Sequence, residues 1–167
     1  TAVRDASNNA LLHLGFLNSF PNNISLLLTA SGINDLASNT MNNGSASFVF
    51  FKAKQNDIII NEIMADPGPV VGLPDAEWIE LKNNSGVDIN LQGWRIGKPS
   101  GQSGPMPSYI LKADSFVLVC SSSAVAALSA FAPSIEVTGF PAISNTGDLL
   151  FLRSPQGLTI HAVDFKD

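Results

Sequence analysis

Carboxylates that could bind a metal ion, or serve as an acid and a base, gather in one stretch of this 167-residue chain. Five of the chain's 14 acidic residues lie within 19 positions there, namely Glu62, Asp66, Asp75, Glu77 and Glu80. Hard cations such as calcium take several oxygen ligands, and a glycosidase needs two carboxyl groups flanking the scissile bond. The stretch therefore raises two chemical possibilities, a calcium site and a hydrolytic site.

The loop inside this stretch decides whether its carboxylates can meet. Residues 58–64 and 78–82 resemble strands, and the segment "PGPVVGLP" joins Asp66 to Asp75. If the two strands pair as a hairpin, Asp66, Asp75, Glu77 and loop carbonyls could supply calcium ligands. The alternative is structural, because the aspartates can accept backbone N–H bonds at the turn while the prolines stiffen the loop. The stretch lacks the regular ligand spacing of a dedicated calcium loop, and we expect no other cofactor.

The residues that could form a catalytic site elsewhere are few. Cys120 is the only cysteine, so the chain can form neither an intrachain disulfide nor a multi-cysteine zinc site. A cysteine nucleophile needs a nearby base, but the only histidines, His13 and His161, fall within strand-like runs. Free cysteine is usually buried, and the motifs of hydrolases and nucleotide-binding enzymes do not occur in the sequence. We expect the chain to be noncatalytic.

Composition limits the class of protein and of partner. With 45% hydrophobic and 14% charged residues, the chain can bury a sizeable core. Residues 1–54 hold three basic and two acidic residues, or +1, whereas residues 55–167 hold 6 basic and 12 acidic residues, or −6. Because the basic residues form no cluster, we expect no direct nucleic-acid partner.

The sequence shows no membrane or targeting segment. No apolar run approaches the roughly 20 residues that span a bilayer. The first residues, "TAVRDASNNALL", lack the basic start and the cleavage site of a signal peptide. We therefore expect any targeting signal to lie outside this sequence.

Short alternating segments and frequent turn signals predict an all-β fold with little helix. The expected strands are residues 11–17, 25–29, 47–51, 58–64, 78–82, 94–96, 116–120, 149–153 and 159–165. Their number and spacing favour a sandwich or a barrel, and a sandwich of this length usually lacks the deep cleft of a glycosidase. Serines precede an alanine-rich segment that predicts one short helix at residues 123–131. A polar segment at residues 51–57 predicts a domain boundary that separates residues 1–54 from residues 55–167.

Residues 33–51, "INDLASNTMNNGSASFVFF", resemble the end of bacterial Ig-like domains, in which a "D-L-A-G-N" turn precedes a final "F-x-F" strand. The matching positions are Ile33, Asp35, Leu36, Ala37, Asn39 and Met41, with Ser38 in place of the usual glycine. The resemblance implies a turn whose short polar side chains bond their own backbone, followed by Phe48 and Phe50 on one face. A complete domain of this kind needs about 100 residues, so we expect residues 1–54 to form a partial Ig-like sheet.

Residues 58 to about 165 resemble the lamin tail domain, an Ig-like antiparallel β-sandwich. Five segments carry the likeness in order: "INEIMADP", "EWIELKNNS", "INLQGWRI", "FVLVCSS" and "ISNTGDLLFLRSPQGLTIHAVDF". The bacterial form of the domain is the nearer likeness, and it usually continues past "VDF". We therefore expect the chain to begin inside its first domain and to stop at Asp167 before the natural end of its second domain.

The matched segments also make physical predictions. Alternation in "EWIELKN" predicts that Ile79 and Leu81 face a core, whereas Trp78, Glu80 and Lys82 face solvent. Trp94 should anchor the core behind Gly93, which allows an unusual backbone conformation. "NTGD" and "SPQG" should be hairpin turns on either side of the strand at residues 149–152. We expect Ile79, Leu81, Trp94, Val117, Val119 and Leu150 to be mostly buried.

The resemblance implies a noncatalytic structural, adhesion or interaction module of a bacterial cell-surface or secreted multidomain protein. The alternative is a targeting or accessory module of an extracellular nuclease, phosphatase or esterase, because bacterial lamin tail domains often lie beside such enzymes. Either reading implies an extracellular, cell-surface or periplasmic location and an unidentified protein or cell-surface ligand. The open strand edges of a partial sheet also predict self-association through residues 1–52.

Overall fold

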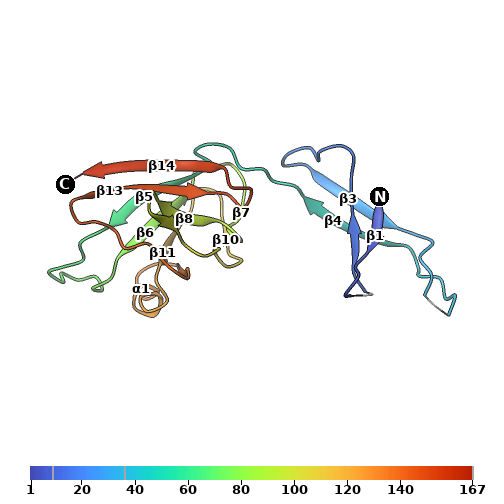
Figure 1. The fold of residues 1–167 in the computed structure, drawn as a ribbon, viewed down its shortest axis with the longest axis horizontal. Coiled ribbons are helices and arrows are strands. Elements are labelled where there is room, and N and C mark those ends of the chain that lie inside the picture. Colours follow the sequence, from blue (N-terminus) through green and yellow to red (C-terminus); the bar gives the residue numbers. More distant parts are fainter. Residues whose placement is uncertain (9, 36, 167) are drawn as a thin grey trace. The chain divides into compact units, whose positions relative to one another are not determined.

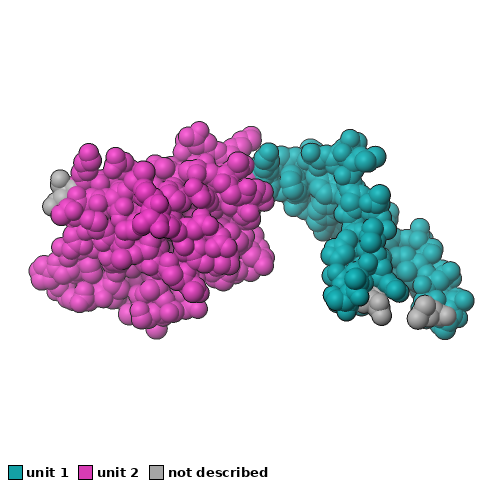
Figure 2. Space-filling model, in the orientation of Figure 1, with its two compact units in different colours: residues 1–52 teal, residues 53–167 magenta. Residues whose placement is uncertain are grey.

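The chain divides into two compact units, residues 1–52 and 53–167 (Figure 2). The computed structural model describes residues 1–8, 10–35 and 37–166. The first unit contains β1 (Ala2–Arg4), β2 (Leu12–Leu14), β3 (Ser25–Ala30) and β4 (Gly44–Val49). The boundary lies two residues before the one expected from the sequence. In the described residues, no helix has the length and apolar character needed to cross a membrane.

The first unit forms two separate antiparallel hairpins, β1–β2 and β3–β4. Leu26 lies opposite Phe48 in β3–β4, and Leu28 shares their face, so one side of this hairpin is apolar. The ring centroid of Phe20 lies 5.3 Å from that of Phe48 and 5.8 Å from that of Phe50. None of the side chains described in this unit is fully buried. The apolar face is therefore only partly buried.

Asp35 holds the turn between β3 and β4. Its Oδ1 accepts the N–H groups of Ala37 at 2.8 Å and Asn39 at 2.9 Å, and the Asn39 side chain donates to its Oδ2 at 2.8 Å. These hydrogen bonds, chiefly the one from the Asn39 side chain, lower the pKa of Asp35. The prediction that polar side chains of this turn bond their own backbone is confirmed. Leu36 of the same motif lies outside the described residues, as does Asp167.

The second unit is the β-sandwich predicted from the sequence. Its strands are β5 (Ile58–Met64), β6 (Trp78–Asn83), β7 (Ile89–Asn90), β8 (Arg95–Lys98), β9 (Gly101–Gln102), β10 (Ile110–Leu111), β11 (Phe116–Cys120), β12 (Ser134–Glu136), β13 (Gly147–Arg153) and β14 (Thr159–Lys166), and its helix is α1 (Val125–Leu128). One sheet has the order β12-β11-β6-β5 and the other β14-β13-β8-β9, with a small β10–β7 pair beside them. Figure 1 shows β13 and β14 along one side of this unit and α1 on the opposite side. All pairs are antiparallel except β11–β12.

The inner faces of the two sheets form the core. The six residues predicted to be buried are all 2% exposed or less: Ile79, Leu81, Trp94, Val117, Val119 and Leu150. Their alternation with outward residues follows from the two-residue period of strands. This part of the sequence prediction is confirmed.

A β-bulge in β5 explains the spacing of its isoleucines. Ile60 pairs with Leu81 and Ile63 pairs with Ile79, and both partners belong to the core. In a regular strand, residues three positions apart point to opposite faces. The register shift between Ile60 and Glu62 leaves Asn61 as an extra residue without a partner in β6, so Ile60 and Ile63 can point to the same face. The bulge therefore keeps both isoleucines on the inner face while Asn61 and Glu62 remain exposed.

A second, smaller core lies on the outer face of the β11–β6 pair. Trp78, predicted to face solvent, is only 7% exposed, and it packs in a cluster with Leu118, Cys120 and Leu128. The prediction is wrong here because α1 covers this face. The helix spans four residues rather than the nine expected, and its first cap position is Ala124, without the side-chain cap that the serines predicted.

Two glycines in the second unit, Gly93 and Gly147, have positive φ angles. Gly93 has φ 83°, which confirms the unusual backbone expected there. "SPQG" joins β13 to β14 as predicted, but "NTGD" is not a hairpin turn, because it joins β13 to β12 of the opposite sheet. Gly147 in this segment has φ 118°, and a Cβ there would lie 2.5 Å from the Phe165 carbonyl oxygen. Only glycine therefore allows β14 to approach so closely.

Candidate functional site

The loop between β5 and β6 extends from one end of the sandwich. The two strands pair antiparallel with Met64 opposite Trp78, so the hairpin predicted from the sequence is confirmed. The Asp66 carboxylate accepts the Gly68 N–H at 3.3 Å, as in the structural alternative for this loop. Beyond this turn the loop displays apolar side chains, with Val70 58%, Val71 83% and Leu73 39% exposed.

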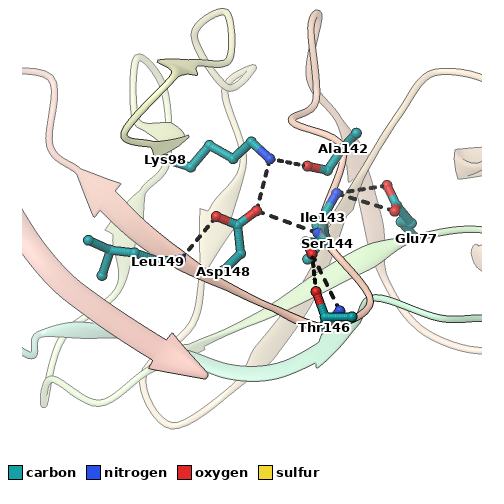
Figure 3. Close-up of polar contacts among 8 residues, drawn as sticks. All are labelled: Glu77, Lys98, Ala142, Ile143, Ser144, Thr146, Asp148 and Leu149. Atoms are coloured by element: carbon teal, nitrogen blue, oxygen red, sulfur yellow. Dashed lines mark hydrogen bonds and ion pairs between the residues drawn. The ribbon is translucent and has the colours of Figure 1, made fainter. Parts of the chain in front are cut away.

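Glu77 binds another loop, the one between β12 and β13. Its carboxylate oxygens accept the Ile143 N–H at 3.2 and 3.3 Å (Figure 3). Among the residues that the structure describes, no group of three or more His, Cys, Asp and Glu side chains is placed to hold a metal ion. The structure therefore does not bring Asp66, Asp75 and Glu77 together, and calcium binding stays a prediction.

Lys98 and Asp148 hold the same loop from the other sheet. Lys98 Nζ donates to the Ala142 carbonyl at 2.7 Å and pairs with Asp148 Oδ2 at 2.8 Å (Figure 3). The Lys98 side chain is the main cause of the lowered pKa of Asp148, which also accepts the Ser144 N–H at 3.4 Å. The loop between β12 and β13 is thus fixed from both sheets, by Glu77 ahead of β6 and by Lys98 of β8.

Shallow depressions lie on both sides of this anchored loop. One of about 410 Å³ is lined by Asp75, Ala76, Glu77, Ser121, Ser123, Ala124, Phe140 and Ala142. Another of about 280 Å³ is lined by Lys98, Ser100, Gly101, Gln102, Gly139, Pro141 and Ala142. Hydroxyl, carboxylate and backbone groups beside a fixed loop can position a partner by hydrogen bonds.

The family-model comparison agrees with this architecture. The model described as Lamin Tail Domain matches residues 52–167. The chain belongs to the lamin tail domain family. No curated protein matches it. Within the lamin tail domain, the loops described above join the strands of an Ig-like sandwich.

The titratable residues considered for catalysis have structural partners in the lamin tail domain. Cys120 is fully buried in β11, and burial, followed by the Glu136 charge, raises the pKa of its thiol to about 11. His161 Nδ1 accepts the Ile60 N–H at 3.1 Å, and burial lowers the pKa of this imidazole. A thiol with a raised pKa is a poor nucleophile at neutral pH. These placements favour structural roles for Cys120 and His161.

His13 lies in the first unit. Its Nε2 is 2.7 Å from Asp5 Oδ2, and the hydrogen bond from His13 is the main cause of the lowered pKa of Asp5. The pair joins β2 to the turn that follows β1.

The sequence did not predict that Lys98, Asp148 and Glu77 bind the loop between β12 and β13. Lys98 and Asp148 are 50 positions apart, and Glu77 and Ile143 are 66 positions apart. The sequence held one signal that these residues matter. Asp148 ends "NTGD" and Lys98 follows "GWRIG", so both lie within or next to segments that carry the family resemblance. Periodicity alone could not pair them.

Proposed function

We propose that the chain is a noncatalytic interaction module of a bacterial cell-surface or secreted multidomain protein, and that its lamin tail domain displays loops to a protein or cell-surface ligand. The observation that carries this proposal is the exposed apolar tip of the β5–β6 loop. Val70, Val71 and Leu73 lie between Pro67 and Pro74, so large apolar groups are presented on a loop with restricted backbone.

The base of this loop supports its use as a binding element. The β5–β6 ladder holds both ends, and Glu77 is fixed by its bonds to the Ile143 N–H. A loop already held in one conformation loses less entropy when it binds, so more of the interaction energy appears as affinity. The Ig-like fold and the structural roles of Cys120 and His161 support a noncatalytic function.

Photo-crosslinking from the loop tip tests this function. A photoreactive amino acid at Val71 of the intact protein, on the cells that produce it, is expected to give an adduct with a surface component. Val70→Ser with Val71→Ser and Leu73→Ser should abolish cell binding by the purified chain. The matched control replaces three exposed apolar residues elsewhere, Ile110, Phe131 and Leu158, with serine. Equal loss in both variants, or no adduct from Val71, would contradict the proposal.

The second candidate function, also inferred from the sequence, is an accessory role beside an extracellular hydrolase. Deleting this module from the intact protein would then slow hydrolysis of particulate or cell-bound substrate and leave hydrolysis of soluble substrate unchanged. A display role predicts no hydrolase domain in the same open reading frame. Fractionation of the producing cells, with detection in the medium, cell surface or periplasm, tests the proposed location.

A further inference from the structure

Two arginines lie side by side on the outer face of the β14-β13-β8-β9 sheet. Arg153 of β13 is the direct partner of Arg95 of β8, and Phe151 is the partner of Gly97. The intervening residues Leu152 and Ile96 are fully buried, so the arginines point away from the core. Like charges at directly opposite positions repel, which makes this pair costly unless an anion meets it.

Phe151 forms a platform for one of these arginines. A Cβ at Gly97 would overlap the Phe151 ring, so the ring lies across the glycine backbone. The Arg153 guanidinium lies 4.5 Å from the ring centroid, and one of its nitrogens, Nη1, donates to Gln102 Oε1 at 3.4 Å. Stacking on an aromatic ring holds the planar guanidinium in one orientation.

Arg95 is also held, by a hydrogen bond of 2.7 Å from its Nη1 to the Ser103 carbonyl. Neither arginine takes part in the four ion pairs found in the described part of the chain. By contrast, Lys82, Lys98 and Lys112 each pair with an aspartate. Two positioned guanidinium groups thus keep donors for an external acceptor.

A depression of about 210 Å³ adjoins Arg153, lined by Lys98, Pro99, Gly101, Gln102, Phe151 and Arg153. Arg153 and Gln102 supply polar groups to it, as does Lys98, whose ammonium is paired with Asp148, and the Phe151 ring and Pro99 supply apolar surface. Next to Phe151 on the same face of β13, Leu149 is 41% exposed. The surface therefore offers carboxylate recognition beside a small apolar area.

We propose that this face, termed the arginine platform (Arg95, Gln102, Phe151 and Arg153), binds the carboxylates of an acidic polypeptide segment. Guanidinium groups recognise carboxylates through paired, charge-assisted hydrogen bonds. A short acidic segment confined to the platform fits better than a long polyanion, because residues 55–167 carry 12 acidic and 6 basic residues and would repel charges that extend beyond the platform. The arginine platform shares no residue with the β5–β6 loop, so it can fail while the proposed function holds.

The test uses the full 167-residue chain and a fluorescein-labelled hexaglutamate peptide, with binding measured by anisotropy at low ionic strength. We expect Arg95→Gln with Arg153→Gln to weaken binding by about tenfold or more, since two charge-assisted contacts are lost. Arg153→Lys keeps the charge but not the planar stacked group, and several-fold weaker binding is expected. Unlabelled hexaglutamate should also shift the NMR signals of the two arginine side chains.

The matched control is Lys112→Gln with Lys166→Gln, which removes the same charge away from the platform, because Lys166 lies opposite Gly147 at the other end of β13 from Arg153. It should change affinity by less than about twofold. No hexaglutamate binding, equal loss in both double variants, or full affinity in Arg153→Lys would overturn the proposal. Binding of heparin that is tighter than that of hexaglutamate and lost in Arg95→Gln with Arg153→Gln would assign the face to a polyanionic glycan instead. Near-UV circular dichroism of each variant checks that the fold is retained.

Discussion

Trp94 is the large aromatic side chain of the main core, with only 2% of its surface exposed. Its backbone is fixed as well, because its N–H donates to the Leu91 carbonyl and its carbonyl accepts the Met106 N–H. Deletion of a buried aromatic side chain leaves a cavity, so Trp94→Ala should lower the free energy of unfolding by about 3 to 5 kcal/mol. Urea unfolding measures the loss, with the exposed Phe131→Ala as control. A loss below about 1 kcal/mol would contradict the role of Trp94 in the core.

His161 makes stability depend on pH at the seam between β14 and β5. Its Nδ1 must lack a proton to accept the Ile60 N–H, and burial lowers its pKa in the folded protein below the ordinary value of 6.5. The unfolded chain therefore binds a proton first as the pH falls, and this draws the equilibrium toward unfolding. The contribution of His161 is complete above about pH 6.5 and is lost as the pH falls through its folded pKa. His161→Gln should flatten this part of the stability profile, and an unchanged profile would contradict it.

Calcium binding by Asp66, Asp75 and Glu77 remains a prediction at the residue scale. If calcium binds, millimolar calcium should raise the melting temperature, because a ligand of the folded state stabilises it. Asp66→Asn with Asp75→Asn should then abolish the rise. Identical melting curves with calcium and with a chelator would leave the loop as a structural hairpin.

At the scale of elements, the long strands were predictable and the two-residue strands were not. β5, β6, β11, β13 and β14 have five to eight residues each, enough for alternation to be visible. β7, β9 and β10 have two residues each, which carry no period. The sequence also did not predict that α1 covers Trp78. Alternation indicates that the two faces of a strand differ, but it does not indicate whether a helix packs on the second face.

The candidate site was predictable only in part, for a similar reason. Sequence spacing placed Asp66 and Asp75 in a hairpin loop, but the partner of Glu77 comes from a segment 66 positions away. Contacts of this range depend on how the sheets stack, which local patterns do not encode.

The anchored β12–β13 loop yields a prediction at this scale. Lys98→Met removes two hydrogen bonds, to Ala142 and Asp148, and leaves the Asp148 carboxylate, whose side chain is only 14% exposed, without its cation. The free energy of unfolding should fall by about 1 to 3 kcal/mol at neutral pH. Hydrogen exchange at the Ile143 and Ser144 amides should accelerate.

The control for this loop is Lys112→Met, which breaks a pair whose two side chains are 70% and 46% exposed. Its cost should stay below about 1 kcal/mol. The lowered pKa of Asp148 adds a pH signature, because its contribution is present above the ordinary carboxyl pKa and is lost as the pH falls below it. Equal losses in both variants would mean that Lys98 does not anchor the loop.

For the whole molecule, the two units differ in how they bury apolar surface. Residues 53–167 contain two stacked sheets and a continuous core, whereas no described side chain of residues 1–52 is fully buried. Single hairpins with one apolar face are marginally stable alone and tend to pair with other chains. We therefore predict that residues 1–52 drive association of the full chain, as the sequence suggested.

Deletion of residues 1–52 tests this prediction and retains Ala53, which is buried in the second unit. The shortened chain should be a folded monomer by light scattering and circular dichroism, because the sandwich keeps its own core. The full chain should form dimers or larger species whose proportion rises with concentration. Leu26→Ser with Phe48→Ser, two partners on the apolar face of β3–β4, should reduce association without deletion. If the full chain is monomeric at all concentrations, the apolar face does not drive self-association, and an unfolded shortened chain would place the domain boundary elsewhere.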